Sequence, residues 1–136
     1  MTSIRQRRIY DIGMHTVIQT SAFLADCRRA GLSNDEVFDI VVAISKNPMA
    51  GDKIPGTGGA LKRRFPGRGK GKSGGYRTVS YFAGDDVPVL MLALISKGER
   101  ADLSQAERNE LRKELAGYAA DYRASVRKRV VVLRRR

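Results

Sequence analysis

The chain has 136 residues, of which 42% are hydrophobic, enough for the core of one ordinary domain; this excludes a wholly disordered polypeptide. Its formal net charge of +12 indicates a polyanionic partner, most simply nucleic acid, because an anionic membrane would favour cations gathered on one amphipathic helix. The longest apolar run, Val87 to Ile95, is too short to span a bilayer, and Cys27 is the single cysteine, so we expect a cytoplasmic protein without disulfides.

The first thirteen residues have no usable periodicity, so residues 1–13 are expected to be a flexible extension, with Met14 as a possible native start. The residues after it, 15–19, have the apolar content of a short strand. A helix should follow, capped by Thr20 or Ser21, with Phe23, Leu24 and Cys27 as its buried stripe and Gly31 as its end.

A second helix begins with a capping box, in which Ser33 is the N-cap and Glu36 stands three residues later. The apolar residues that follow recur at the spacing of one helix face, at Val37, Ile40, Val41 and Ile44. The Asn47-Pro48 pair should end this helix, and the glycines of residues 51–59 predict a loop.

Three strands are expected next, at residues 61–65, 76–82 and 87–95, joined by short turns and therefore antiparallel neighbours. A long helix should start at the capping box Ser104–Glu107, with one face formed by Leu111, Leu115, Tyr118 and Tyr122. The predicted fold class is α+β, a small antiparallel sheet with two N-terminal helices and a C-terminal helix on one face, in the order β-α-α-β-β-β-α.

The domain is expected to span residues 14–122 and to be followed by a basic tail, residues 123–136, with seven cations and no acidic residue. The sequence leaves open whether that tail is helical, a further strand or disordered.

The usual catalytic side chains are scarce. The one histidine, His15, is more simply a surface residue, Cys27 is more simply a core residue, and no spacing of ligands predicts a metal or cofactor. The stretch 69–74 matches GxGxxG, and Gly71-Lys72-Ser73 resembles the end of a P-loop. A strand and not a helix is predicted after them, so we interpret the segment as a basic hairpin turn.

A cluster of cations remains on the predicted strands. Lys62 and Arg64 are two residues apart and so should share one face, near Arg77 on the adjacent strand. Lys97 and Arg100 follow the last strand, and the same surface should include Arg63, Lys70, Lys72 and the stacking rings of Tyr76 and Tyr81.

Such a cluster can cleave RNA without histidine. Attack by the 2′-hydroxyl needs a base, positive charge on the phosphorane oxygens and an acid for the leaving oxygen; crowded lysines and arginines can provide these. From charge alone, a patch that only binds phosphates is the simpler interpretation.

Several stretches resemble the HigB-like branch of the RelE/ParE toxin superfamily. The similar segments are 50–59, 61–65, 69–77 and 92–104, which include the motifs Gly74-Gly75-Tyr76-Arg77 and Ser96-Lys97-Gly98-Glu99-Arg100. The resemblance implies a metal-independent, ribosome-dependent endoribonuclease that cleaves mRNA, with a cognate antitoxin encoded in the same operon. That antitoxin is expected to carry a helix-turn-helix and to provide the only contact with operator DNA.

The resemblance also implies site residues. Lys62, Arg64, Arg77 and Lys97 match the catalytic cations, and we hypothesise that Lys62 or Arg64 assists the 2′-hydroxyl while Arg77 and Lys97 neutralise the phosphate. A tyrosine found after the last strand in some relatives is replaced by Leu103-Ser104, which leaves the general acid open among Lys97, Arg100 and a terminal residue. The alternatives are a non-catalytic RNA- or ribosome-binding module and a ParE-like gyrase poison.

Overall fold

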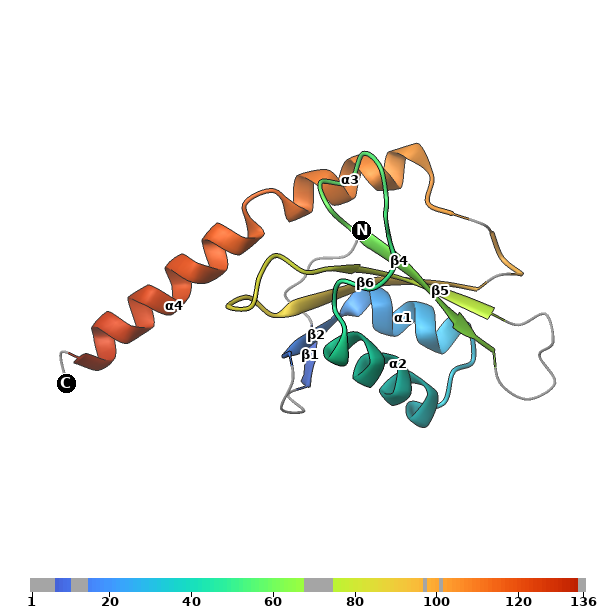
Figure 1. Ribbon diagram of the computed structural model, residues 1–136, viewed down its shortest axis with the longest axis horizontal. Coiled ribbons are helices and arrows are strands. Elements are labelled where there is room, and N and C mark those ends of the chain that lie inside the picture. Colours follow the sequence, from blue (N-terminus) through green and yellow to red (C-terminus); the bar gives the residue numbers. More distant parts are fainter. Residues whose placement is uncertain (1–6, 11–14, 68–74, 97, 101, 135–136) are drawn as a thin grey trace.

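The computed structural model describes residues 7–10, 15–67, 75–96, 98–100 and 102–134, with the backbone alone for 7–10 and 130–134. A mixed sheet forms its middle layer (Figure 1). The strands are β1 Arg7–Tyr10, β2 Val17–Thr20, β3 Asp52–Lys53, β4 Leu61–Pro66, β5 Gly75–Tyr81 and β6 Val89–Ser96. The helices are α1 Ser21–Arg29, α2 Asn34–Lys46, α3 Gln105–Leu115 and α4 Tyr118–Arg134. The predicted α+β class is confirmed, and the predicted order of elements holds with additions.

The first two helices begin and end where their capping residues place them. The Thr20 hydroxyl accepts a hydrogen bond from the Phe23 N–H, which identifies Thr20 and not Ser21 as the N-cap of α1. Ser33 and Glu36 form the predicted reciprocal capping box of α2, and Asn47 is its C-cap. These local hydrogen bonds satisfy N–H groups that no helical carbonyl can reach, so the sequence alone located both starts.

The sheet order is β1-β2-β6-β5-β4-β3, and it is not purely antiparallel as predicted. The β4–β5 and β5–β6 pairs are antiparallel as expected, whereas β2 runs parallel to β6, with Ile18 opposite Leu90. Strands β2 and β6 are separated by most of the domain, so their relative direction depends on how the intervening helices return the chain. No local pattern specifies that direction.

Helices cover both faces of the sheet, which corrects the expectation of one covered face (Figure 1). On one face, α1 and α2 pack side chains such as Phe23 and Ile44 against β2 and β6. On the other face, Leu111 and Leu115 of α3 pack against Leu90 and the strands beside it. The central strand β6 is therefore apolar at nearly every position, because its alternate side chains enter two different cores.

The predicted long C-terminal helix is two helices. The chain breaks at Ala116 and Gly117, and Gly117 has φ +83°, a left-handed conformation that residues with a Cβ adopt only with strain. Helix α4 then continues through residue 122, where we predicted that the domain ends, to Arg134. The backbone of the basic tail is thus helical over its described residues.

The N-terminal segment contains a strand that the sequence did not predict. Four of the thirteen residues expected to be a flexible extension, Arg7–Tyr10, form β1, which pairs antiparallel with β2. Two further residues of the predicted loop 51–59 form the short β3 beside β4. Both additions are edge strands. Neither shows the apolar alternation that would have predicted a strand, and each is held by its pairing with the neighbouring strand.

Candidate active site

The alternation of side chains along β4 divides its cations between the two faces of the sheet. Lys62 contacts Asp102 on the face covered by α3, and Arg63 contacts Ala43 of α2 on the opposite face. Because side chains alternate along a strand, Arg64 lies on the same face as Lys62. In the β4–β5 register, Arg64 lies directly opposite Arg77. The three cations Lys62, Arg64 and Arg77, named the basic triad from here on, therefore share one face, as the sequence predicted.

The Arg64–Arg77 arrangement brings two like charges close together. Side chains directly opposite on antiparallel strands have Cβ atoms roughly 4.5–5.5 Å apart, and like charges at such positions are destabilising. Arg64 is exposed, and Arg77 is half-buried. Two arginines held side by side on a rigid sheet can bind the oxygens of one phosphate, which would offset their mutual repulsion.

A carboxylate lies against the third member of the basic triad. The Lys62 ammonium donates a hydrogen bond of 3.0 Å to the Asp102 carboxylate, which also lies 3.5 Å from the Arg108 guanidinium of α3. Burial of Asp102 acts to raise its pKa, but hydrogen bonds from the Leu103 N–H and Lys62, with the charges of Lys62 and Arg108, lower it overall. Asp102 therefore stays ionised and holds Lys62 in place.

Asp102 and Arg108 are site residues that the sequence analysis missed. Asp102 lies inside the 92–104 segment that carried the family resemblance, immediately before the Leu103-Ser104 start of the α3 capping box. This position could have drawn attention to Asp102 in the sequence, because the backbone just before a helix N-cap is held in a defined conformation. Only the fold, however, brings it to a lysine forty positions earlier in the chain.

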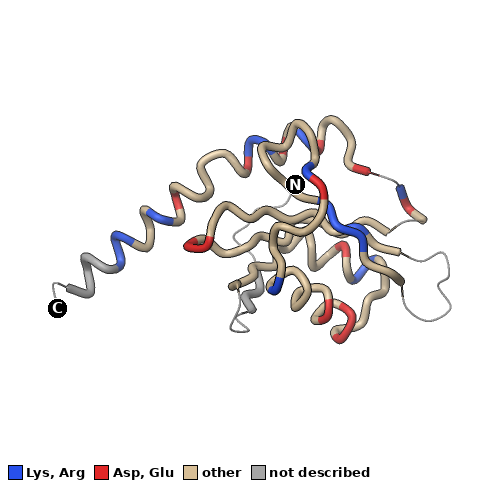
Figure 2. The backbone as a smooth tube through the Cα atoms, in the orientation of Figure 1, with Lys and Arg blue, Asp and Glu red and all other residues tan. Residues whose placement is uncertain are grey.

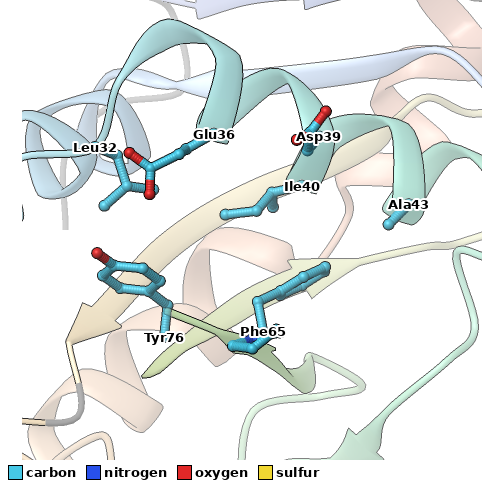
Figure 3. A pocket seen from close by; sticks show the side chains of 8 residues that line it. Leu32, Glu36, Asp39, Ile40, Ala43, Phe65 and Tyr76 are labelled. Atoms are coloured by element: carbon cyan, nitrogen blue, oxygen red, sulfur yellow. The ribbon is translucent and has the colours of Figure 1, made fainter. Parts of the chain in front are cut away.

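Arg63 and Tyr76, both predicted to bind RNA, lie on the opposite face from the basic triad. The Arg63 guanidinium donates to the Ala43 carbonyl of α2 at 3.2 Å and lies 5.0 Å from the centre of the Phe65 ring. Tyr76 is opposite Phe65 and lines a hollow of about 190 Å³ between α2 and the β4–β5 strands (Figure 3). These two side chains serve packing on the α2 face, and the structure does not bring them to the triad.

Arg100, another predicted RNA-binding residue, is held by an ion pair. Its guanidinium donates two hydrogen bonds to Glu107, one of them 2.9 Å long, at the first turn of α3. The hydrogen bond from Arg100 is the largest cause of the lowered pKa of Glu107, which falls to about 2. The predicted site residues Lys70, Lys72 and Lys97 lie outside the described residues.

Cys27 packs into the core, as its simpler interpretation proposed, whereas His15, interpreted more simply as a surface residue, is partly covered. Cys27 is buried, and burial, followed by the nearby charge of Asp26, raises the pKa of its thiol to about 12. His15 is half-buried with its ring 5.1 Å from that of Phe82, in an edge-to-face contact. Among the described residues, no group of three His, Cys, Asp or Glu side chains could hold a metal ion.

Residues 68–74 lie outside the described residues, and the residue that follows them begins a strand. Residue 75 begins β5, and the register pairs it with Pro66, the last residue of β4. A dinucleotide site or P-loop would need a helix N-terminus at this point. The predicted strand after these residues is confirmed, since β5 begins at Gly75. In the described part of the chain, no helix is both long and apolar enough to cross a membrane.

A model of a known protein family matches residues 15–133 of the chain. The matching family is described as the RelE toxin of the RelE/RelB toxin–antitoxin system. The matched range includes the basic triad, Asp102 and most of α4. It supports the RelE part of the predicted resemblance, and the HigB-like branch stays a prediction.

Proposed function

This chain belongs to the RelE toxin family and is a toxin of a toxin–antitoxin system, and from that premise we propose that it is a ribosome-dependent endoribonuclease that cleaves mRNA. The observation that carries the proposal is the cross-strand Arg64–Arg77 pair on the same face as Lys62. A rigid set of adjacent cations is suited to a phosphodiester that gains negative charge in its transition state.

Each member of the basic triad has a role that follows from its chemistry. Arginine remains protonated in proteins, so Arg64 and Arg77 stabilise the charge of the pentacoordinate phosphorane and cannot act as bases. Lys62 can exchange a proton, so its amine accepts the proton of the 2′-hydroxyl as O2′ attacks phosphorus. The P–O5′ bond breaks as the O2′–P bond forms, the 5′-oxygen takes a proton from a general acid that the sequence leaves open, and the other product strand ends in a 2′,3′-cyclic phosphate.

Asp102 completes this set as a positioning residue. Its carboxylate holds the resting Lys62 ammonium at 3.0 Å. Lys62 acts as the base after it has released a proton to water, and the carboxylate then stabilises the ammonium that forms again when the amine accepts the proton of the 2′-hydroxyl. Arg108 of α3 contacts the same carboxylate and helps to hold it in position. The assignment sharpens the hypothesis from sequence, in which either Lys62 or Arg64 assisted the 2′-hydroxyl.

The family implies a cognate antitoxin as partner. We propose, as the sequence suggested, that this antitoxin has a helix-turn-helix, is encoded in the same operon and alone contacts operator DNA. The RNA substrate is mRNA in the ribosomal A site, and the reaction uses no cofactor.

The test is mRNA cleavage by the purified protein with and without translating ribosomes, with Arg77→Ala as the comparison. Loss of one charged group on the phosphorane should reduce the rate of cleavage about 10²–10³-fold. The circular-dichroism spectrum and melting temperature should stay close to those of the parent protein. Cuts that need ribosomes and disappear in the variant would support both the activity and the site.

Two results would contradict the proposal. Intact mRNA in both conditions, together with tight RNA binding, would identify a non-catalytic RNA-binding module. Intact mRNA together with inhibition of DNA gyrase by the purified protein would identify a ParE-like poison.

A further inference from the structure

Helix α4 has a base that is fixed to the domain. The Tyr118 hydroxyl donates to the Pro88 carbonyl at 3.1 Å, and the Tyr118 ring contacts those of Tyr81 and Tyr122. One turn later, the Arg123 guanidinium donates two hydrogen bonds to the Asp86 carboxylate, at 2.6 and 2.8 Å. The left-handed Gly117 redirects the chain just before this base, so the direction of α4 is set by specific contacts.

Beyond Arg123 the helix leaves the body of the protein (Figure 1). We call residues 124–134 the basic arm; at 1.5 Å per residue it is roughly 16 Å long. Arg127, Lys128 and Arg129 are exposed, and no acidic residue follows Asp121 in the sequence. An ordinary surface helix would carry acidic residues that pair with such cations, so the arm has an uncompensated positive charge.

The distribution of this charge favours RNA over a protein as the occupant. Three consecutive helical residues are about 100° apart around the axis, so Arg127, Lys128 and Arg129 point to different sides of the arm. The arm also carries apolar residues, the exposed Val126 and residues 130–133. A helix that docks on a protein confines its charge to the side opposite its apolar stripe, whereas the three cations of the arm are not confined to one side. Cations on several sides suit a groove lined by phosphates, where each contact releases a bound counterion.

We propose that the basic arm is a second RNA-binding element, which grips a phosphate-lined groove of structured RNA while the basic triad acts on the mRNA. This inference rests on the proposed function, because it assigns the arm to the same RNA-containing target. In Figure 2 the cations of the arm and those of β4 and β5 lie in separate parts of the molecule. The arm therefore contributes to affinity for the target and leaves the chemical step unchanged.

The experiment measures the binding of a 20-base-pair RNA duplex, and of intact ribosomes, across a range of salt concentrations. The test variant is R127Q/K128Q/R129Q, since glutamine keeps helix propensity and removes charge. Both it and its parent carry Arg77→Ala so that the RNA stays intact. The control variant R28Q/K46Q/K113Q removes the same charge from exposed positions on α1, α2 and α3.

The salt dependence separates a specific contact from a change in net charge. Loss of three phosphate contacts should reduce the slope of log K against log salt by about 2.7 for the duplex, with a fall in affinity on the order of 100-fold at low salt. The control variant should keep most of the parental slope. In a background with native Arg77, the arm variant should raise KM for ribosome-dependent cleavage and keep kcat.

Equal slopes for the arm variant and the control variant would overturn the inference. Unchanged RNA binding together with loss of the antitoxin complex would also overturn it, and would make the arm a protein-docking helix. Because the binding readout does not need cleavage, a failure of the proposed nuclease activity would be seen separately, as intact mRNA in a protein whose arm still binds the duplex.

Discussion

The two faces of the sheet carry different kinds of side chain, although the same strands form both. The face under α1 and α2 is closed by apolar packing, and its arginine, Arg63, donates to a helix carbonyl and stacks on Phe65. The face under α3 carries the basic triad and the carboxylate of Asp102. Adjacent residues of identical type, Arg63 and Arg64, thus have opposite environments, so residue type and proximity in sequence do not identify a site.

The largest expected effect separates these two arginines. Arg64→Ala removes a charge that faces the phosphate, so we expect cleavage to fall about 100-fold, or about 2.7 kcal/mol at 1.36 kcal/mol per tenfold. Stability should change little, because Arg64 is exposed. Cleavage kinetics and urea denaturation of the same preparation measure the two quantities.

Arg63→Ala is the matched control on the closed face. It should cost roughly 1 kcal/mol of stability, through the lost hydrogen bond to Ala43 and the lost contact with Phe65, and leave kcat close to the parental value. If Arg63→Ala lost activity while Arg64→Ala kept it, the assignment of faces to functions would be reversed.

A smaller effect is expected at the positioning carboxylate. Asp102→Asn keeps the side-chain size and an acceptor for the Leu103 N–H but removes the charge that stabilises the Lys62 ammonium. We expect kcat to fall about tenfold with little change in KM, which is the pattern of an interaction that strengthens in the transition state. Single-turnover cleavage on saturating ribosomes measures this, and a change confined to KM would show that Asp102 only helps to bind RNA.

The smallest effect concerns the two capping boxes, one on each face. The pKa of Glu107 is lowered to about 2, so its ion pair with Arg100 contributes stability above the usual value of 4.5 and loses that contribution as the pH falls toward 2. Both side chains are substantially exposed, so the contribution should stay under about 1 kcal/mol.

Glu107→Gln keeps the capping geometry and should reduce the melting temperature at pH 6, with the difference from the parent disappearing toward pH 2. Glu36→Gln, in the capping box of α2, is the control, and its effect should be smaller. An equal loss in both variants at pH 6 would assign the effect to capping and not to the Arg100 ion pair.

Interactions between residues close in sequence made several features of this protein predictable. Ser33 and Ser104 predicted two helix starts because a capping box needs only residues three positions apart. The alternation of side chains along a strand placed Lys62 and Arg64 on one face, and the short turn between the strands predicted that Arg77 would lie beside them. The same alternation places Arg63 on the other face. The prediction that Arg63 binds RNA beside Lys62 and Arg64 was therefore inconsistent with this alternation.

What the sequence by itself determined are features set by a few neighbouring residues: the helix starts, the β4–β5 and β5–β6 pairs and the shared face of the basic triad. Only the tertiary structure decided the parallel pairing of β2 with β6, the covering of both faces, the contact of Asp102 with Lys62 and the projection of α4. The physical reason is that these features depend on contacts between segments far apart in the chain. Their energies come from burial and from charges brought close by the fold, which no local pattern encodes.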